Sequence, residues 1–474
     1  MKPIHFLIVC FGSFLIAGCQ FDPELNTLAT ETPDDSSSPT AMAISTIAAE
    51  ESSPTATGTL FPTSTATEAV TPPPTFVVPD VPPETRLAFQ CLNIQPGENS
   101  EPGLEGTLIL DKEVPIDDEH LEHRVVFLDL TAGLIIAEEG GFFPLVSLDH
   151  RYVAYYQTEL DKQGSIIKRD LIVSDSKGNH VVQISRQEDW IVPKGWADSE
   201  RLFIGVSPQS AGEGFLEPPA WLIFNPFTGD SQLLKPVFDR FLSRASIPLP
   251  GSWGGAVYNQ NLTQAVYLRF AGDDEEFFTH GLWDLTSGQL VVSLDQIFQT
   301  FSIYNDIYLE PNWAPDGSKF AFVNKMPAED DTELYVVTSG GEIQQVTNLA
   351  PYMYLRDSLS WSPDGRQIAT FISPNYRDKG GQLAVIDTLT GDVTNYCLQA
   401  PSLQPHRLYP RPPIWSPDGT KLIFDIETFE EDPVLPMIYR LTAVKVILVD
   451  IEKGLAWEIA EDMIPVGWMP GTTP

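Results

Sequence analysis

The chain has 474 residues, and its 65 acidic residues outnumber its 28 Lys and Arg residues, which gives a formal net charge of −37. This excess of negative charge argues against partners that are themselves polyanions, because nucleic acid or an anionic membrane surface would be repelled. The predicted elements, taken in chain order, point to an exported protein whose folded part is built from β-strands.

Residues 1–18 have the pattern of an export signal. Lys2 supplies a basic start, Phe6 to Leu15 form an apolar stretch too short to span a bilayer, and "IAGC" provides small residues before a cleavage site. This resembles the bacterial lipoprotein signal, with Cys19 as the lipidated first residue of the mature chain. An ordinary secretory signal with an incidental Cys is the alternative. A lipid on Cys19 would anchor the protein without a transmembrane helix, since no later segment is apolar for long enough.

Residues 19–85 are predicted to form a disordered tether. The segment consists mainly of Thr, Ser, Pro and Ala with scattered acids, a composition that cannot bury enough apolar surface to fold. Proline runs such as Thr71 to Thr75 should keep it semi-extended, so we expect a spacer between the anchor and a folded domain at 86–474.

Three near-identical segments make the folded domain an internal repeat. "WAPDGSKFAFV" begins at Trp313, "WSPDGRQIATF" at Trp361 and "WSPDGTKLIFD" at Trp415, and a period of about fifty residues is typical of propeller blades. In each copy the Pro presets φ, the Asp accepts hydrogen bonds from turn amides and the Gly supplies the left-handed residue of a hairpin. We therefore expect Asp316, Asp364 and Asp418 to be structural and not catalytic.

A second pattern accompanies the first: two apolar runs of alternating, β-branched residues joined by a short Gly turn, which predicts a pair of strands. Seven such pairs occur, from "RVVFLDLTAGLIIAE" to "VKVILVDIEKGLAWEI". The Trp that opens each repeat is here called its anchor. The last anchor, Trp468, has no partner strand after it, and the predicted strand "LEGTLILD" at Leu104–Asp111 has no anchor before it. The sequence therefore predicts an all-β propeller of four-stranded blades, seven favoured and six or eight possible, with one blade completed by both termini.

The Trp-Ser-Pro-Asp-Gly turn followed by an apolar strand resembles the WD-like repeat of TolB-like β-propeller proteins. The resemblance is strongest from about residue 300 to 470. It implies a binding or scaffolding role, not a fixed chemistry, and TolB-like propellers usually have six blades, so the seven pairs depart from that pattern.

The cysteines bear on compartment and on the entry segment. With Cys19 lipidated, Cys91 and Cys397 remain as an even pair in the mature chain, and in an exported protein such a pair is interpreted as a disulfide. It would hold the segment before the first strand to the rim of the propeller. Two unpaired buried thiols are the alternative.

No cofactor or metal site is expected. His120 and His123 in "DDEHLEH" lack the spacing of a zinc peptidase and are interpreted as part of a solvated loop. Acidic clusters such as Asp273 to Glu276 and Glu430 to Asp432 have no EF-hand spacing, and we expect them to solubilise the protein, with a calcium site as the alternative. No Gly-x-Ser-x-Gly elbow is present.

Function is predicted from an asymmetry between the two faces of the propeller. The turn within each strand pair is short, whereas the connections between pairs and between blades are long and should share one face, here named the long-loop face. Arg and Tyr, common interface anchors, are concentrated there. In the other interpretation they fill the channel mouth or pair with acids. The candidate binding residues are Arg240, Arg244, Tyr304, Tyr308, Tyr352, Tyr354, Arg356, His406, Arg407, Tyr409 and Arg411.

The leading hypothesis is a lipid-anchored, extracytoplasmic and noncatalytic module that binds an envelope protein, peptide or glycan through the long-loop face, as a monomer. The second is an envelope hydrolase or lyase, in which His406, Tyr409 and Arg411 carry out acid–base chemistry in the channel. The third is a passive spacer or assembly scaffold.

Overall fold

The structure is a computed structural model of the whole chain. It describes residues 84–96, 104–115, 121–160, 166–185, 189–208, 220–233, 257–270, 278–294, 297, 312–325, 332–349, 353–356, 358–374, 380–400, 411–431 and 439–471. The predicted signal, nearly all of the tether, and Cys19 and His120 therefore lie outside the described residues.

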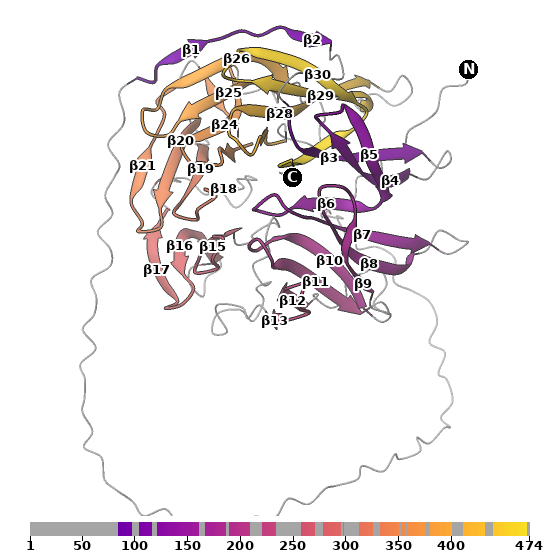
Figure 1. Ribbon diagram of the computed structural model, residues 1–474. Helices are drawn as coiled ribbons and strands as arrows, with labels where there is room; N and C mark the ends of the chain where they lie inside the picture. Colours follow the sequence, from indigo (N-terminus) through magenta and orange to yellow (C-terminus); the bar gives the residue numbers. More distant parts are fainter. Residues whose placement is uncertain are drawn as a thin grey trace, which may run out of the picture. The chain divides into compact units, whose positions relative to one another are not determined.

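Seven small sheets, in which the four blade strands pair antiparallel, form a seven-bladed β-propeller, and the described residues contain no helix (Figure 1). The innermost strands of neighbouring blades contact one another around the ring where the structure describes them, for example β23 and β27, β27 and β31, and β31 and β6. The all-β fold, the seven blades and the seven predicted outer strand pairs are confirmed.

The strands of each blade, from the innermost outward, are as follows. Blade 1 has β31 (Ile464–Met469), β3 (Thr107–Pro115), β4 (Leu121–Asp129) and β5 (Leu134–Gly140); blade 2 has β6 (Phe142–Val146), β7 (Val153–Leu160), β8 (Ile166–Ser174) and β9 (His180–Ser185); blade 3 has β10 (Asp189–Trp196), β11 (Leu202–Pro208), β12 (Ala220–Phe224) and β13 (Ser231–Leu233); blade 4 has β14 (Val257–Tyr258), β15 (Gln264–Phe270), β16 (Phe278–Asp284) and β17 (Gln289–Ser293).

Blade 5 has β18 (Asn312–Trp313), β19 (Lys319–Lys325), β20 (Thr332–Thr338) and β21 (Ile343–Gln345); blade 6 has β22 (Tyr354–Leu355) and β23 (Ser360–Trp361), both paired with β24 (Gln367–Ser373), then β25 (Gly381–Asp387) and β26 (Val393–Ala400); blade 7 has β27 (Ile414–Trp415), β28 (Lys421–Glu431), β29 (Tyr439–Asp450) and β30 (Leu455–Glu461).

The core lies between adjacent blades. Alternate side chains of each strand point to opposite faces of the sheet, so both faces of the middle strands pack against neighbouring blades. Phe371 of blade 6 meets Phe424 of blade 7 edge to face, with ring centroids 5.8 Å apart. The repeated Trp adds a polar tie: the indole Nε1 of Trp361 donates to the carbonyl of Asn312 at 2.8 Å, and that of Trp415 to Ser360 at 2.9 Å. Each of these two Trp residues therefore ties its blade to the one before it.

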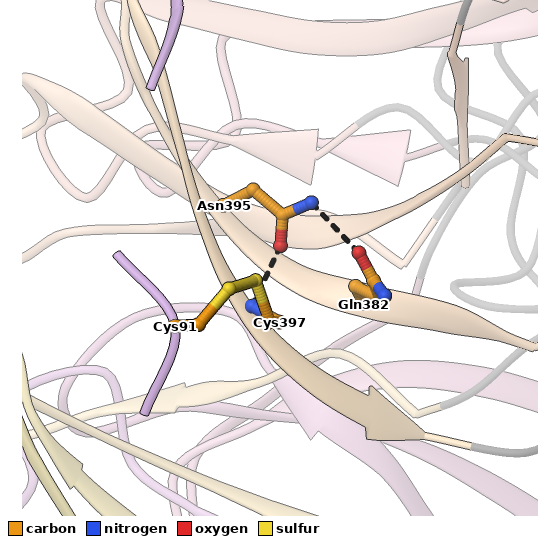
Figure 2. The surroundings of a disulfide bond; sticks show 4 residues. All are labelled: Cys91, Gln382, Asn395 and Cys397. Carbon is orange, nitrogen blue, oxygen red and sulfur yellow. Dashed lines mark hydrogen bonds between the residues drawn. A yellow bond between two sulfur atoms is a disulfide. The ribbon is translucent and has the colours of Figure 1, made fainter. Parts of the chain in front are cut away.

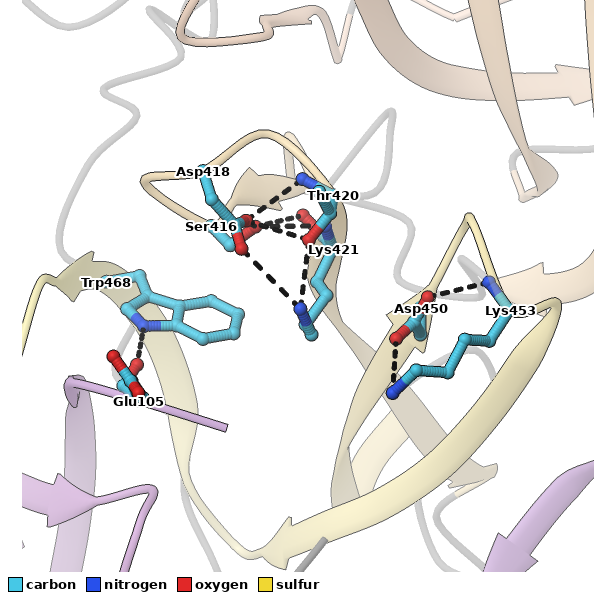
Figure 3. Close-up of polar contacts among 8 residues, drawn as sticks. All are labelled: Glu105, Ser416, Asp418, Thr420, Lys421, Asp450, Lys453 and Trp468. Carbon is cyan, nitrogen blue, oxygen red and sulfur yellow. Dashed lines mark hydrogen bonds and ion pairs between the residues drawn. The ribbon is translucent and has the colours of Figure 1, made fainter. Parts of the chain in front are cut away.

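Both ends of the folded domain complete blade 1, as predicted. Strand β31 pairs antiparallel with β3, in a register that places Trp468 opposite Leu108. Trp468 is 2% exposed, and its indole donates to the carbonyl of Glu105 at 3.0 Å (Figure 3). Gly106, at φ 102°, sits so close that an added Cβ would lie 2.3 Å from the carbonyl oxygen of Met469. Only glycine fits this closure point without displacing β31.

A belt formed by residues 84–96 is the main departure from the predicted four-stranded blades. Strand β1 (Leu87–Phe89) pairs parallel with β26, and β2 (Ile94–Pro96) pairs parallel with β30, so the entry segment adds a fifth layer to blades 6 and 7 before the chain enters blade 1 (Figure 1). The predicted disulfide between Cys91 and Cys397 joins the belt to β26 between these two pairings. Figure 2 shows Asn395 beside the bond; its Oδ1 accepts from the Cys397 amide at 2.7 Å.

Candidate functional site

The topology gives the propeller two unlike faces. Because the strands of a blade run antiparallel in chain order, the turn inside the inner pair and the turn inside the outer pair lie at one end, here named the short-turn face. The connections between pairs and between blades lie at the other end, the long-loop face. Their lengths are uneven, which corrects the expectation that all are long: β5 and β6 are separated by Gly141 alone.

Carboxylates of the short-turn face are engaged in holding turns. Ser416 Oγ and the Thr420 amide both donate to Asp418, and the Lys421 ammonium lies 3.6 Å from it (Figure 3). Burial alone would raise the pKa of Asp418, but these hydrogen bonds and the charge of Lys421 outweigh it and lower the pKa to about 2. The carboxylate thus stays ionised as an acceptor, and the structural interpretation of the motif Asp is supported.

The predicted binding residues are only partly described. Eight of them lie outside the described residues: Arg240, Arg244, Tyr304, Tyr308, Tyr352, His406, Arg407 and Tyr409. The structure describes Tyr354, Arg356 and Arg411. Tyr354 is half-buried in the short strand β22, where it pairs with Ser373 of β24.

Arg356 is buried, contrary to the exposed position that a recognition anchor requires. The residue is 2% exposed, its guanidinium Nε donates to the carbonyl of Gly380 at 3.1 Å, and its backbone amide donates to Phe371 at 2.9 Å. Thr370 Oγ1 donates in turn to the Arg356 carbonyl at 2.9 Å. These contacts fix segment 353–356 against β24, so the side chain supports the loop rather than contacting a partner.

Replacing Arg356 by Ala should therefore destabilise the fold. The buried Gly380 carbonyl would lose its donor, which costs about 1–3 kcal/mol for an unsatisfied buried group. The free energy of unfolding, measured in urea, should fall by that amount. Arg366→Ala is the matched control, because Arg366 is exposed on the short-turn face and should change stability by about 0.5 kcal/mol or less. Equal stability of the two variants would contradict the assigned role.

Arg411 forms ion pairs with acidic residues, which is the alternative to partner binding that the sequence left open. Its guanidinium forms ion pairs with Asp425 and Glu427, two residues apart on the same face of β28, and the Glu427 contact is 2.9 Å. Both carboxylates are largely buried, with side chains 7% and 12% exposed. The planar guanidinium can contact two carboxylates at once, and 24% of the Arg411 side chain remains exposed.

A further cluster lies where blades 1 and 2 meet on the long-loop face. His123 belongs to β4 and is not in a solvated loop; its Nδ1 lies 3.4 Å from Asp111 Oδ1, and its Nε2 lies 4.0 Å from Glu113 Oε1. The hydrogen bond to Asp111 raises the pKa of His123, burial opposes this, and the charges of both carboxylates add to the rise. The imidazole can therefore carry a positive charge at mildly acidic pH.

Aromatic rings continue this cluster into blade 2. The His123 ring lies 4.9 Å from Phe142, and Phe142 stacks on Tyr156 at 5.4 Å. The neighbouring Phe143 ring lies 5.7 Å from Tyr156, and the Arg169 guanidinium lies 5.1 Å from the same ring centroid. These aromatic residues could not be recognised from the sequence, because "GGFFPLV" contains no copy of the Trp-Ser-Pro-Asp-Gly turn.

The described residues offer no other cofactor or anchoring feature. No group of three or more His, Cys, Asp or Glu side chains among them is placed to hold a metal ion. The part of the chain that the structure describes contains no apolar helix of membrane-spanning length.

Comparisons with known proteins add little on function. No family model and no curated protein matches this sequence. Similar solved structures include TolB from Acinetobacter baumannii, with 14% identity, a TM-score of 0.38 and coverage of 83% of this chain and 98% of TolB. Oligogalacturonate lyase from Vibrio parahaemolyticus has 13% identity, a TM-score of 0.41 and coverage of 75% and 86%. The periplasmic gluconolactonase of Pseudomonas aeruginosa has 12% identity, a TM-score of 0.41 and coverage of 77% and 97%. At this level of similarity, these neighbours do not decide between a binding protein and an enzyme.

Proposed function

We propose that this protein is a lipid-anchored, extracytoplasmic β-propeller that acts as a noncatalytic binding module for an envelope protein, peptide or glycan. The observation that carries the proposal is that the short-turn face and the long-loop face of the propeller differ in structural role. Described carboxylates of the short-turn face, such as Asp364 and Asp418, hold turns together. The long-loop face instead receives the variable connections and the exposed ring of Phe143.

The extracytoplasmic location draws support from the sequence and from the disulfide. The "IAGC" segment has the pattern of a lipoprotein signal, and a bond between Cys91 and Cys397 is typical of an oxidising compartment. The long Thr/Ser/Pro-rich segment would hold the propeller away from the membrane while leaving its faces accessible.

The anchor is tested by metabolic labelling with a fatty acid. Wild-type chain should incorporate the label and remain with membranes, because the acyl chain inserts into the bilayer. The Cys19→Ser variant should lose both properties. Equal labelling and membrane retention of that variant would exclude Cys19 as the lipidated residue.

Recognition is tested by affinity capture from envelope extracts with the mature protein. A captured partner should bind less well to an Arg407→Ala, Tyr409→Ala double variant on the long-loop face, by about tenfold or more if these side chains are anchors. Arg366→Ala on the short-turn face is the control and should bind normally. Lys421 is unsuitable as a control, because its side chain is 13% exposed and pairs with Asp418. Binding lost only in the Arg366 variant would show that the wrong face has been chosen.

An envelope hydrolase or lyase is the second candidate, and the pair of His123 and Asp111 is the observation that favours it. A half-buried imidazole with a raised pKa beside a carboxylate has the properties of an acid–base group. If the wild-type protein turns over a captured ligand and the His123→Gln variant does not, the protein is an enzyme and not a noncatalytic binding module.

A further inference from the structure

Phe143 combines two unfavourable features at one residue. Its side chain is 59% exposed, so a large apolar ring faces water. Its backbone has φ 51°, in the left-handed region that a bulky side chain rarely adopts. The strain arises from a register shift between Phe142 and Leu145 in the pairing of β6 with β7. Strained backbone of this kind, costing about 1–3 kcal/mol, is concentrated at functional sites.

Among the described residues the ring of Phe143 is accessible, and the connection between blades 1 and 2 beside it is a single residue, Gly141. The Gly141 amide donates to the carbonyl of His123 at 3.0 Å, which fixes the connecting residue to β4 of blade 1. Phe143 is therefore presented from the innermost strand of a rigid blade.

The rings beside Phe143 already accept a cation. Arg169 places its guanidinium 5.1 Å from the centroid of the Tyr156 ring, which is 6% exposed and also contacts Phe143. A ring attracts a cation through the negative charge on its face, and an arginine side chain also stacks on it through its flat apolar surface. The exposed ring of Phe143 offers the same chemistry to a second guanidinium from outside.

The charges around the rings favour the binding of a cationic group. Arg124 forms contacts of 2.9 Å with both Glu122 and Glu138, whereas Glu113 is 46% exposed and its Oε1 lies 4.0 Å from His123 Nε2. The pKa of His123 is raised by its hydrogen bond to Asp111 and, against the effect of burial, by the charges of Asp111 and Glu113. The net charge of −37 would speed the approach of a basic partner and repel an acidic one.

We propose that the Phe143 surface, formed by Phe143, Tyr156, His123 and Glu113, docks a basic peptide segment of a protein partner. One arginine or lysine side chain stacks on the Phe143 ring, and the segment extends across His123 towards the Glu113 carboxylate. This inference rests on the proposed binding function and names the chemical class of its ligand.

The test measures the dissociation constant of an acetylated tetra-arginine peptide with the mature, full-length protein. Phe143→Ala should weaken binding about fivefold through loss of stacking, and Glu113→Gln about threefold through loss of charge. The matched controls are Phe89→Ala, where the ring is 60% exposed on the belt, and Glu342→Gln on the short-turn face. Both controls should stay within a factor of two. Tetra-citrulline, the uncharged analogue, should bind at least tenfold more weakly.

Phe143→Gly separates recognition from folding. Glycine adopts a positive φ without steric strain, which offsets the lost ring contact and the greater freedom of the unfolded chain, so this variant should melt near the wild-type temperature and still lose affinity for the peptide. Equal peptide affinity in Phe143→Ala and Phe89→Ala, or equal binding of tetra-citrulline, would overturn the proposal. Loss of binding to an immobilised glycan in Phe143→Ala, with peptide affinity unchanged, would instead make this surface a saccharide platform. Neither result would affect a partner captured through Arg407 and Tyr409, so the broader binding function fails only on its own test.

Discussion

A chain truncated after Asp462 should not fold into a stable propeller. The truncation removes β31, the inner strand of blade 1, which pairs with the inner edge of β3. Trp468 and Met469 are 2% and 0% exposed, and loss of one large buried side chain costs about 3–5 kcal/mol. Losing both, together with the hydrogen bonds between β31 and β3, should cost a free energy comparable with the total stability of a typical domain.

Circular dichroism during heating measures this effect. The control is a chain that ends at Gly471, which retains all of β31 and should melt at the wild-type temperature. Trp468→Ala is an intermediate case, expected to lower the free energy of unfolding by about 3–5 kcal/mol without removing the strand. If the chain ending at Asp462 melted with the control, closure by both termini would not be what holds blade 1.

Loss of the disulfide should produce the second largest effect. The bond between Cys91 and Cys397 closes a loop with a sequence separation of 306 residues, and a loop of that size stabilises by about 5 kcal/mol in the chain-entropy model. Cys397→Ser should lower the urea midpoint accordingly, because the belt then loses its covalent link and keeps two short parallel pairings, the hydrogen bonds around them and the packing of Leu87 and Leu92.

Reduction supplies the control for this prediction. Wild-type protein treated with dithiothreitol should match Cys397→Ser, and the variant itself should not respond to the reductant. Peptide mapping under nonreducing conditions should recover Cys91 linked to Cys397 from exported protein. Free thiols at both positions, with an unchanged urea midpoint on reduction, would contradict the assigned bond.

The blades were predictable because their signal is repeated and local. Each anchor Trp is followed by a turn whose Pro, Asp and Gly have separate backbone roles, and each outer pair alternates apolar residues around a short turn. Closure by the termini followed from counting strands, since an anchor without a partner at one end matched a strand without an anchor at the other. The register of Trp468 opposite Leu108 then confirmed that inference.

The belt escaped prediction for a physical reason. Strands β1 and β2 have only three residues each and pair in parallel, so neither alternation nor a hairpin turn marks them in the sequence. Their stability comes from edges that other blades provide and from the disulfide. The Cys pair indicated where the segment is fastened but not that it lies along two blades as strands.

The binding residues were harder to predict than the belt, because the sequence gives the type of each residue but not its exposure. Arg356 and Arg411 both precede an anchor Trp, yet one is buried against β24 and the other forks between Asp425 and Glu427. His123 was assigned to a loop on the acids around it, although the strand it occupies pairs it opposite Glu113 of β3. Cross-strand neighbours of this kind emerge only once the register is known.

Hydrogen–deuterium exchange of the mature protein, with and without a captured partner, tests the central claim most directly. If the long-loop face recognises the partner, backbone amides of 141–146 and of the connection at 401–410 should exchange more slowly in the complex. Amides of the short turns at Asp316, Asp364 and Asp418 should exchange at unchanged rates, because they face away from the partner. Protection confined to those short turns would contradict recognition through the long-loop face.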